Sequence, residues 1–143
     1  MKTPWHIWVV GLVTLLWHAG GAYDYLSAKL QPEAYLLAVP EDLRTPLAAY
    51  MAAMPIWATA TWALGVWGAV LGSLLILFRS RLAVPAFAVA LFGLIATSAY
   101  TYLLAPSSPM GAAPSLFFTT LIVLVLVFAL VYARRQVAAG HLR

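Results

Sequence analysis

The chain alternates between long apolar stretches and short polar ones. Charged residues are absent from residues 45–78 and from residues 82–133. A membrane span needs roughly 20 apolar residues, so each uncharged stretch must contain more than one helix or turn. We expect spans at about residues 5–23, 55–78, 83–104 and 115–133, with Pro106, Pro109 and Gly111 marking the last turn.

Composition supports this division. Hydrophobic residues make up 64% of the chain, charged residues make up 8%, and the mean hydropathy is +0.93. Soluble domains carry about 25% charged residues, so the sequence predicts an integral membrane protein in direct contact with the lipid bilayer. The expected fold is all-α, a four-transmembrane-helix bundle formed by a single domain of residues 1–143.

The first apolar stretch also resembles a secretory signal peptide, because a basic residue precedes it. Three tryptophans and two histidines make it a poor signal sequence. We therefore expect a retained helix.

The segment of residues 24–54 is the polar part of the chain and holds all four acidic residues. Leu43, Leu47 and Tyr50 recur in it at helical spacing. Thr45 and Pro46 have the residue types preferred just before and at the start of a helix, so we expect the helix to begin there. This pattern predicts a short interfacial helix lying in the membrane surface.

Basic residues near the helix ends predict the orientation. With four spans both termini share one side, and that side collects six basic residues against two on the other. The six are Lys2, Arg79, Arg81, Arg134, Arg135 and Arg143, and the two are Lys29 and Arg44. Because basic residues favour the cytoplasmic side, we expect a bacterial inner-membrane protein with both termini in the cytoplasm and residues 24–54 in the periplasm. Arg79, Arg81, Arg134 and Arg135 could also contact lipid head groups.

Small residues form a stripe along one face of each of the first three expected helices. The stripes are Gly11, Thr14, His18, Gly21 and Tyr25; Ala58, Thr61, Gly65, Gly68 and Gly72; and Ala86, Ala90, Gly93, Thr97 and Tyr100. Small residues let helices approach closely in lipid, so these stripes are expected to be packing seams, with a permeation path as the alternative. The fourth helix lacks such a stripe and is expected to face lipid or another subunit.

Four residues are candidates for ligand binding: His18, Asp24, Tyr25 and Trp57. His18 is an ionisable group inside a span, which by default suggests a function, although a neutral histidine bonded to a hydroxyl or carbonyl is the structural alternative. Asp24 lies at the outer rim, where it could instead solvate the helix end or pair with Lys29 or Arg44.

The sequence gives no indication of metal binding, catalysis or nucleic-acid binding. The chain has no cysteine, and His6 and His18 lie about 18 Å apart along a helix, so we expect no metal and no cofactor. No arrangement of serine, histidine and acid is recognisable, and we expect no enzymatic activity. The basic residues are dispersed and form no nucleic-acid-binding patch.

The segments LWHAGGAYDYL and PIWATATWALGVWGAVLGSLLILFRSRLAVPAF resemble a family of small bacterial inner-membrane proteins. Its pattern is LWN-x-x-G-x-x-DY in the first helix and PxW…WxxxVWGxxLGxxLLLxRxRxAVPxF in the central hairpin. Some members carry the automatic name "sugar transporter". The matching positions are Trp17, Gly20 or Gly21, Asp24, Tyr25, Pro55, Trp57, Trp67, Gly68, Gly72, Arg79, Arg81 and Pro85. His18 replaces the asparagine of the pattern, which favours hydrogen bonding over proton transfer because both side chains can form hydrogen bonds.

Two functions remain open. The first is a non-enzymatic interaction or accessory subunit of a homo-oligomer or a larger membrane complex, because four helices leave little interior for a solute pathway. The alternative is a small-solute transporter or binding module, for a sugar among other solutes, formed by several copies.

Overall fold

The computed structural model describes residues 4–105, 109 and 113–143. Lys2 and most of the turn expected at Pro106 to Gly111 lie outside the described residues. All regular structure within the described ranges is helical. The helices are α1 (Trp5–Leu30), α2 (Pro32–Leu37), α3 (Glu41–Ala53), α4 (Ile56–Leu77), α5 (Ala83–Ala99), the π-helical turn η1 (Tyr100–Leu104) and α6 (Ala113–Ala138).

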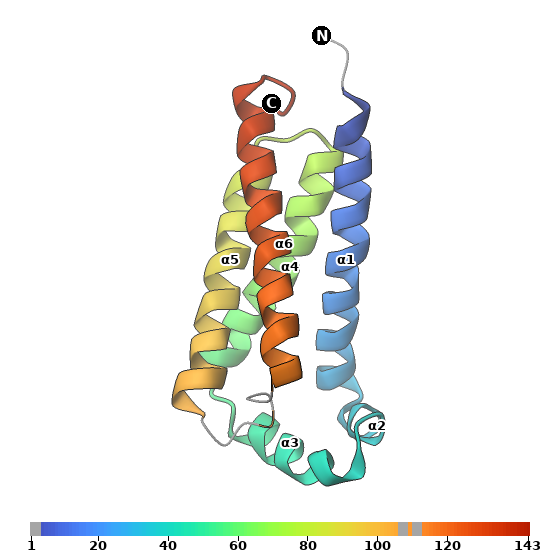
Figure 1. The fold of residues 1–143 in the computed structure, drawn as a ribbon, viewed down its shortest axis with the longest axis vertical. Coiled ribbons are helices and arrows are strands. Elements are labelled where there is room, and N and C mark those ends of the chain that lie inside the picture. The colour runs from blue at the N-terminus through green and yellow to red at the C-terminus, as the bar shows by residue number, and fades with distance from the viewer. Residues whose placement is uncertain (1–3, 106–108, 110–112) are drawn as a thin grey trace.

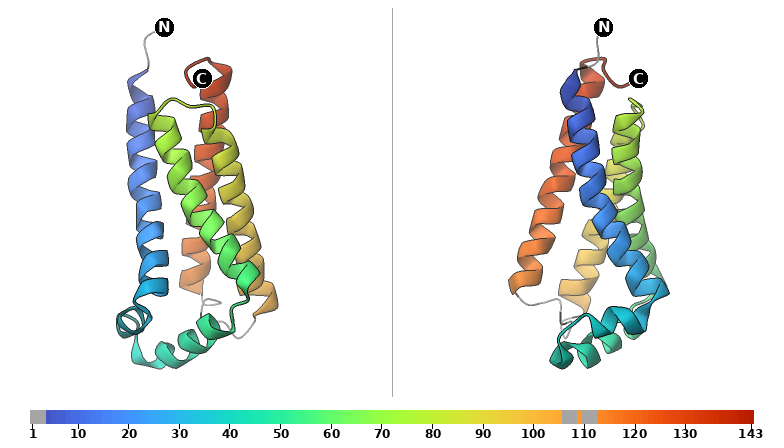
Figure 2. Two further views of the ribbon diagram at one scale, coloured as in Figure 1. Left: turned by 180° about the vertical axis from the view of Figure 1, so that it is seen from behind. Right: turned by 90° about the vertical axis from the view of Figure 1, so that its right-hand side faces the viewer.

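Four long helices, α1, α4, α5 and α6, lie side by side and form a bundle (Figure 1). The N-terminus, the C-terminus and the turn between α4 and α5 lie at one end of the bundle, which we call the terminal end. The short helices α2 and α3 lie across the opposite end. Seen from behind in Figure 2, α4 lies between α1 and α5, and α6 covers the far side.

Three helical stretches are long and apolar enough to cross a membrane: Ile56–Leu77, Ala83–Leu104 and Ser115–Ala138. These agree closely with the second, third and fourth spans expected from the sequence. Helix α1 has 26 residues but is not one of the three stretches, since it carries polar residues such as His6 and His18. It also continues to Leu30, seven residues beyond the end expected at Tyr23.

The predicted start of the polar-segment helix at Thr45 and Pro46 is wrong. Helix α3 begins at Glu41, directly after Pro40, and Pro46 lies inside it. Two acidic residues in the first turn favour this earlier start, because negative charge is stabilised at a helix N-terminus. Pro46 lacks an N–H and removes one backbone hydrogen bond, a loss that this short helix accommodates. The segment also contains a second short helix, α2, that the sequence did not predict.

Helices α4 and α5 approach each other very closely. A Cβ atom built on Gly93 of α5 would lie 2.5 Å from the backbone nitrogen of Gly65 and 2.5 Å from the carbonyl oxygen of Thr61. A Cβ atom on Gly68 would lie 3.2 Å from the carbonyl oxygen of Ala86. Real Cβ atoms do not tolerate contacts below 3.0 Å, so Gly93 is the position at which this seam requires glycine.

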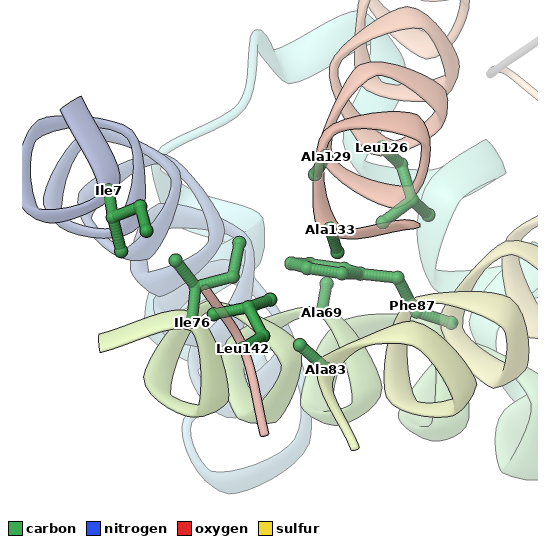
Figure 3. Packing of buried hydrophobic residues seen from close by; sticks show 10 residues of the cluster. Ile7, Ala69, Ile76, Ala83, Phe87, Leu126, Ala129, Ala133 and Leu142 are labelled. Carbon is green, nitrogen blue, oxygen red and sulfur yellow. The ribbon is translucent and has the colours of Figure 1, made fainter. Parts of the chain in front are cut away.

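The terminal half of the bundle is densely packed (Figure 3). Ile7 of α1, Ile76 of α4, Phe87 of α5 and Leu126 of α6 are fully or almost fully buried. Leu142 joins this core from the segment after α6. Two backbone hydrogen bonds, of 3.0 and 2.8 Å, hold that segment against the turn between α4 and α5. This turn contains Arg79 and Arg81, and we call it the arginine turn.

Candidate functional site

The half of the bundle nearest α3 contains a cavity of about 850 Å³. All four long helices contribute to its wall, together with η1, α3 and one residue of α2. Ala69 and Leu126 belong to both the packed core and the cavity wall, so the inner end of the cavity lies directly on the core. Its main polar or aromatic lining residues are Trp17, His18, Asp24, Tyr35, Tyr50, Trp62, Thr97, Ser98, Thr101, Tyr102, Ser115, Phe118 and Thr119.

The cavity reaches the surface between α1 and α6. Leu16 and Gly20 of α1 and Phe118 of α6 are exposed and also line the cavity. The right-hand view of Figure 2 shows these two helices diverging toward the end where α3 lies. The rings of Trp17 of α1 and Phe118 of α6 are tilted against each other, with centroids 6.1 Å apart. In a bilayer, an opening between two long helices would face lipid.

His18 lines the deep end of the cavity and is 6% exposed. Its Nδ1 atom lies 2.9 Å from the Oγ atom of Ser73, and its ring lies 6.1 Å from that of Phe87. Ser73 also donates a 3.0 Å hydrogen bond to the carbonyl oxygen of Ala69. The other ring nitrogen of His18, Nε2, is buried and has no hydrogen-bond partner among the described residues.

Asp24 and Tyr35 meet at the outer rim, where the Tyr35 hydroxyl donates a 3.2 Å hydrogen bond to Asp24. Burial, together with the Asp24 carboxylate, raises the pKa of Tyr35 to about 12, so Tyr35 remains a donor at neutral pH. The two basic residues proposed as alternative partners of Asp24 have other contacts. Lys29 lies 5.5 Å from the centre of the Trp62 ring, and Arg44 donates to two backbone carbonyl groups.

Four hydroxyl groups of the wall pair with one another. Tyr50 pairs with Thr101 at 2.8 Å, and Tyr102 pairs with Thr119 at 2.8 Å. Thr97 is bonded in the same way to Thr61 of α4, at 3.0 Å. These pairs join different helices and satisfy polar groups that would otherwise face an apolar space.

The helical turn η1 supplies two residues of this wall, Thr101 and Tyr102. Its π-helical geometry is seen in the 2.9 Å hydrogen bond from the N–H of Ala105 to the carbonyl oxygen of Tyr100, five residues earlier. Short π-helical turns occur frequently at functional sites. This geometry is therefore consistent with a functional cavity.

The structure separates the four predicted ligand-binding residues. His18 and Asp24 both line the cavity. Tyr25 instead packs its ring against Trp62, with centroids 4.9 Å apart. Trp57 is 47% exposed and lies beside Tyr100, with ring centroids 5.5 Å apart.

The small-residue stripes have mixed positions. Gly11 faces Leu77 across the contact between α1 and α4, and Thr14 is buried and bonded to its own helix. Gly65, Gly68, Gly72 and Ala90 lie in the seam between α4 and α5. Gly21 was predicted to pack against another helix, but a Cβ atom placed on it would meet no atom within 4 Å. Gly21 lines the cavity instead.

Sequence reasoning missed several lining residues, including Tyr35, Tyr50, Thr101 and Tyr102. For Tyr50, the available signal was its helical spacing with Leu47, which indicates that both side chains lie on one face of α3. Tyr35, Thr101 and Tyr102 lie near helix ends, where tyrosines are usually interfacial anchors. Within the described part of the chain, no three His, Asp or Glu side chains lie close enough to hold one metal ion.

Together, the helical fold and the apolar helices define a helical membrane protein with an internal cavity. The chain matches no family model, no curated protein and no solved structure at a significant level. The family resemblance of the two segments described above therefore stays a prediction.

Proposed function

We propose that this protein is a non-enzymatic membrane protein that binds a small, largely apolar molecule inside its bundle. The cavity of about 850 Å³ carries the proposal, because ligand sites typically measure roughly 300–1,000 Å³ and have mainly apolar walls with few polar groups. An accessory subunit was expected from the sequence because four helices would leave little interior. The cavity favours the alternative function, a small-solute binding module or transporter. Because the cavity lies within one chain, this function does not need several copies of the protein.

The wall favours an apolar molecule over a sugar. A sugar needs many free hydrogen-bonding groups, since each of its buried hydroxyls is costly without a partner. Here the hydroxyls of Tyr50, Thr101, Tyr102 and Thr119 are already paired with one another. Leu16, Phe118 and Leu126 offer apolar contact instead.

The proposal includes a topology in which α1 is a fourth membrane span. Helix α1 lies alongside α4 in the bundle (Figures 1 and 2), and its 26 residues would be about 39 Å long, more than a bilayer core requires. The arginine turn and both termini share one end, which the excess of basic residues places in the cytoplasm of a bacterial inner membrane. Helices α2 and α3 then lie at the periplasmic surface.

A test uses the purified full-length protein in detergent and an alkyl photoaffinity probe, a decyl chain that carries a diazirine. We expect the probe to label peptides of the cavity wall, and excess decanol to prevent the labelling. Gly21→Trp should reduce labelling tenfold or more, because its side chain would occupy part of the cavity. Ala19→Trp is the matched control, since Ala19 is exposed on the same helix but does not line the cavity. Equal labelling of both variants would contradict the proposal.

An interaction or accessory role is the second candidate, and the outer face of α6 favours it. Phe117, Leu124 and Phe128 are more than half exposed there, and α6 packs mainly against α5. This face could contact lipid, a second copy or a larger membrane complex. Native mass measurement in mild detergent distinguishes these, because a bare monomer that takes up the probe would contradict the accessory role.

A further inference from the structure

The hydrogen bonds of Ser73 identify which ring nitrogen of His18 is a hydrogen-bond acceptor. Ser73 has one hydroxyl hydrogen, and it donates that hydrogen to the carbonyl oxygen of Ala69 at 3.0 Å. The Ser73 oxygen must therefore accept the 2.9 Å hydrogen bond from Nδ1 of His18. The proton of the imidazole then lies on Nδ1, and Nε2 keeps a free lone pair, since a neutral imidazole has one donor and one acceptor.

The ring is neutral because nothing near it balances a charge. Its described polar partner is the uncharged Ser73 hydroxyl, and its aromatic neighbour is Phe87. The cavity's carboxylate, Asp24, lies at the outer rim and is bonded to Tyr35. A buried and unpaired imidazolium would be very costly.

The side chain of His18 belongs to the cavity wall, and its Nε2 atom is itself enclosed. His18 is only 6% exposed and contributes to the cavity wall, yet Nε2 has no partner among the described residues. An unsatisfied buried acceptor is unusual in a folded protein and often indicates a missing partner. Four wall hydroxyls bond to one another, those of Tyr50, Thr101, Tyr102 and Thr119. By contrast, Nε2 of His18 is the buried side-chain polar atom without a partner among the described residues.

We propose that Nε2 of His18 accepts a hydrogen bond from the hydroxyl group of an uncharged, otherwise apolar ligand, such as a long-chain alcohol. This inference rests on the proposed function and specifies its ligand. A carbonyl or ether oxygen has no proton to donate and would face the lone pair of Nε2 unfavourably. A carboxylate or ammonium would bring an unpaired charge to the deep end of the cavity.

The test compares decanol with decyl methyl ether as competitors of the photoaffinity probe on the full-length protein. The ether keeps the chain and the oxygen but cannot donate. We expect decanol to compete about tenfold more strongly, because the ether would leave the buried acceptor unpaired. His18→Phe should bring decanol down to the level of the ether. The control His6→Phe should preserve the difference, since His6 bonds to Tyr132 at the terminal end.

The outcomes separate the two proposals. If neither compound competes, the proposed function fails together with this inference. If both compete equally on the unaltered protein, the cavity binds alkyl chains only and this inference alone fails, whether or not His18→Phe folds. As a second measurement, nitrogen-15 NMR of labelled histidine should show the His18 proton on Nδ1 in the ligand-free protein. A proton on Nε2 would overturn the assignment.

Discussion

Replacing Gly93 with alanine should force α4 and α5 apart. The new Cβ atom would lie 2.5 Å from two backbone atoms of α4, about 1 Å short of ordinary carbon contact. Backbone atoms cannot rotate away as side chains can, so the helices must separate along the seam. Inserting a methyl group into a well-packed core costs about 1–3 kcal/mol.

The matched control is Gly20→Ala, because a Cβ atom at Gly20 meets nothing within 4 Å. Both changes gain the same helix propensity of alanine over glycine, about 1 kcal/mol, so this gain cancels in the comparison. We expect the free energy of unfolding of Gly93→Ala to be about 1–3 kcal/mol lower than that of Gly20→Ala. Unfolding in mixed micelles with rising SDS, followed by circular dichroism, measures the difference. Equal stability of the two variants would refute the close approach of α4 and α5.

A hydrogen bond between helices, a backbone angle and the topology can each be tested separately. Thr97→Val should lower the free energy of unfolding by about 0.6 kcal/mol, the average for a hydrogen bond between membrane helices, since it removes the 3.0 Å bond to Thr61. In the control Thr120→Val, the lost hydroxyl bonds within its own helix, so stability should change little. Equal losses of stability in the SDS titration would contradict this prediction. Arg79 has φ 57°, so Arg79→Gly should be about 1 kcal/mol more stable than Arg79→Ala, and equal values would argue against this backbone conformation. Alkaline phosphatase fused after Arg143 should be inactive, because this enzyme is active only outside the cytoplasm. Alkaline phosphatase activity of that fusion would overturn the topology.

Much of the helical architecture could be predicted from the sequence. The spans expected at 55–78, 83–104 and 115–133 lie within a few residues of the apolar helices in the structure, because an uncharged stretch bounded by proline or arginine determines a helix locally. The helix start at Pro46 was wrong, since the preference for proline in a first turn competed with the acidic residues at Glu41 and Asp42. The two preferences differ by a small free energy, and the sequence alone does not show which of them is larger.

The candidate site was predictable only in part. His18 and Asp24 attracted attention because polar groups are rare inside apolar helices, and both line the cavity. Tyr25 lies on the same helix as these two residues and Trp57 lies on α4, but their rings pack against Trp62 and Tyr100. A helix pattern identifies which residues share a face, whereas the residues across from that face depend on how the helices cross.

The sequence by itself determined the class of this protein, because hydropathy and charge are properties of each stretch alone. The cavity was decided by the tertiary structure. Glycines bring α4 and α5 into contact at Gly65 and Gly93, while the rings of Tyr25 and Trp62 stand between α1 and α4 near the α3 end. The close packing of α4 and α5 and the divergence of α6 from α1 together leave the cavity. Its presence depends on how the helices are arranged and cannot be inferred from any one helix. The free acceptor of His18 likewise exists only because Ser73, 55 residues away, uses its one proton elsewhere.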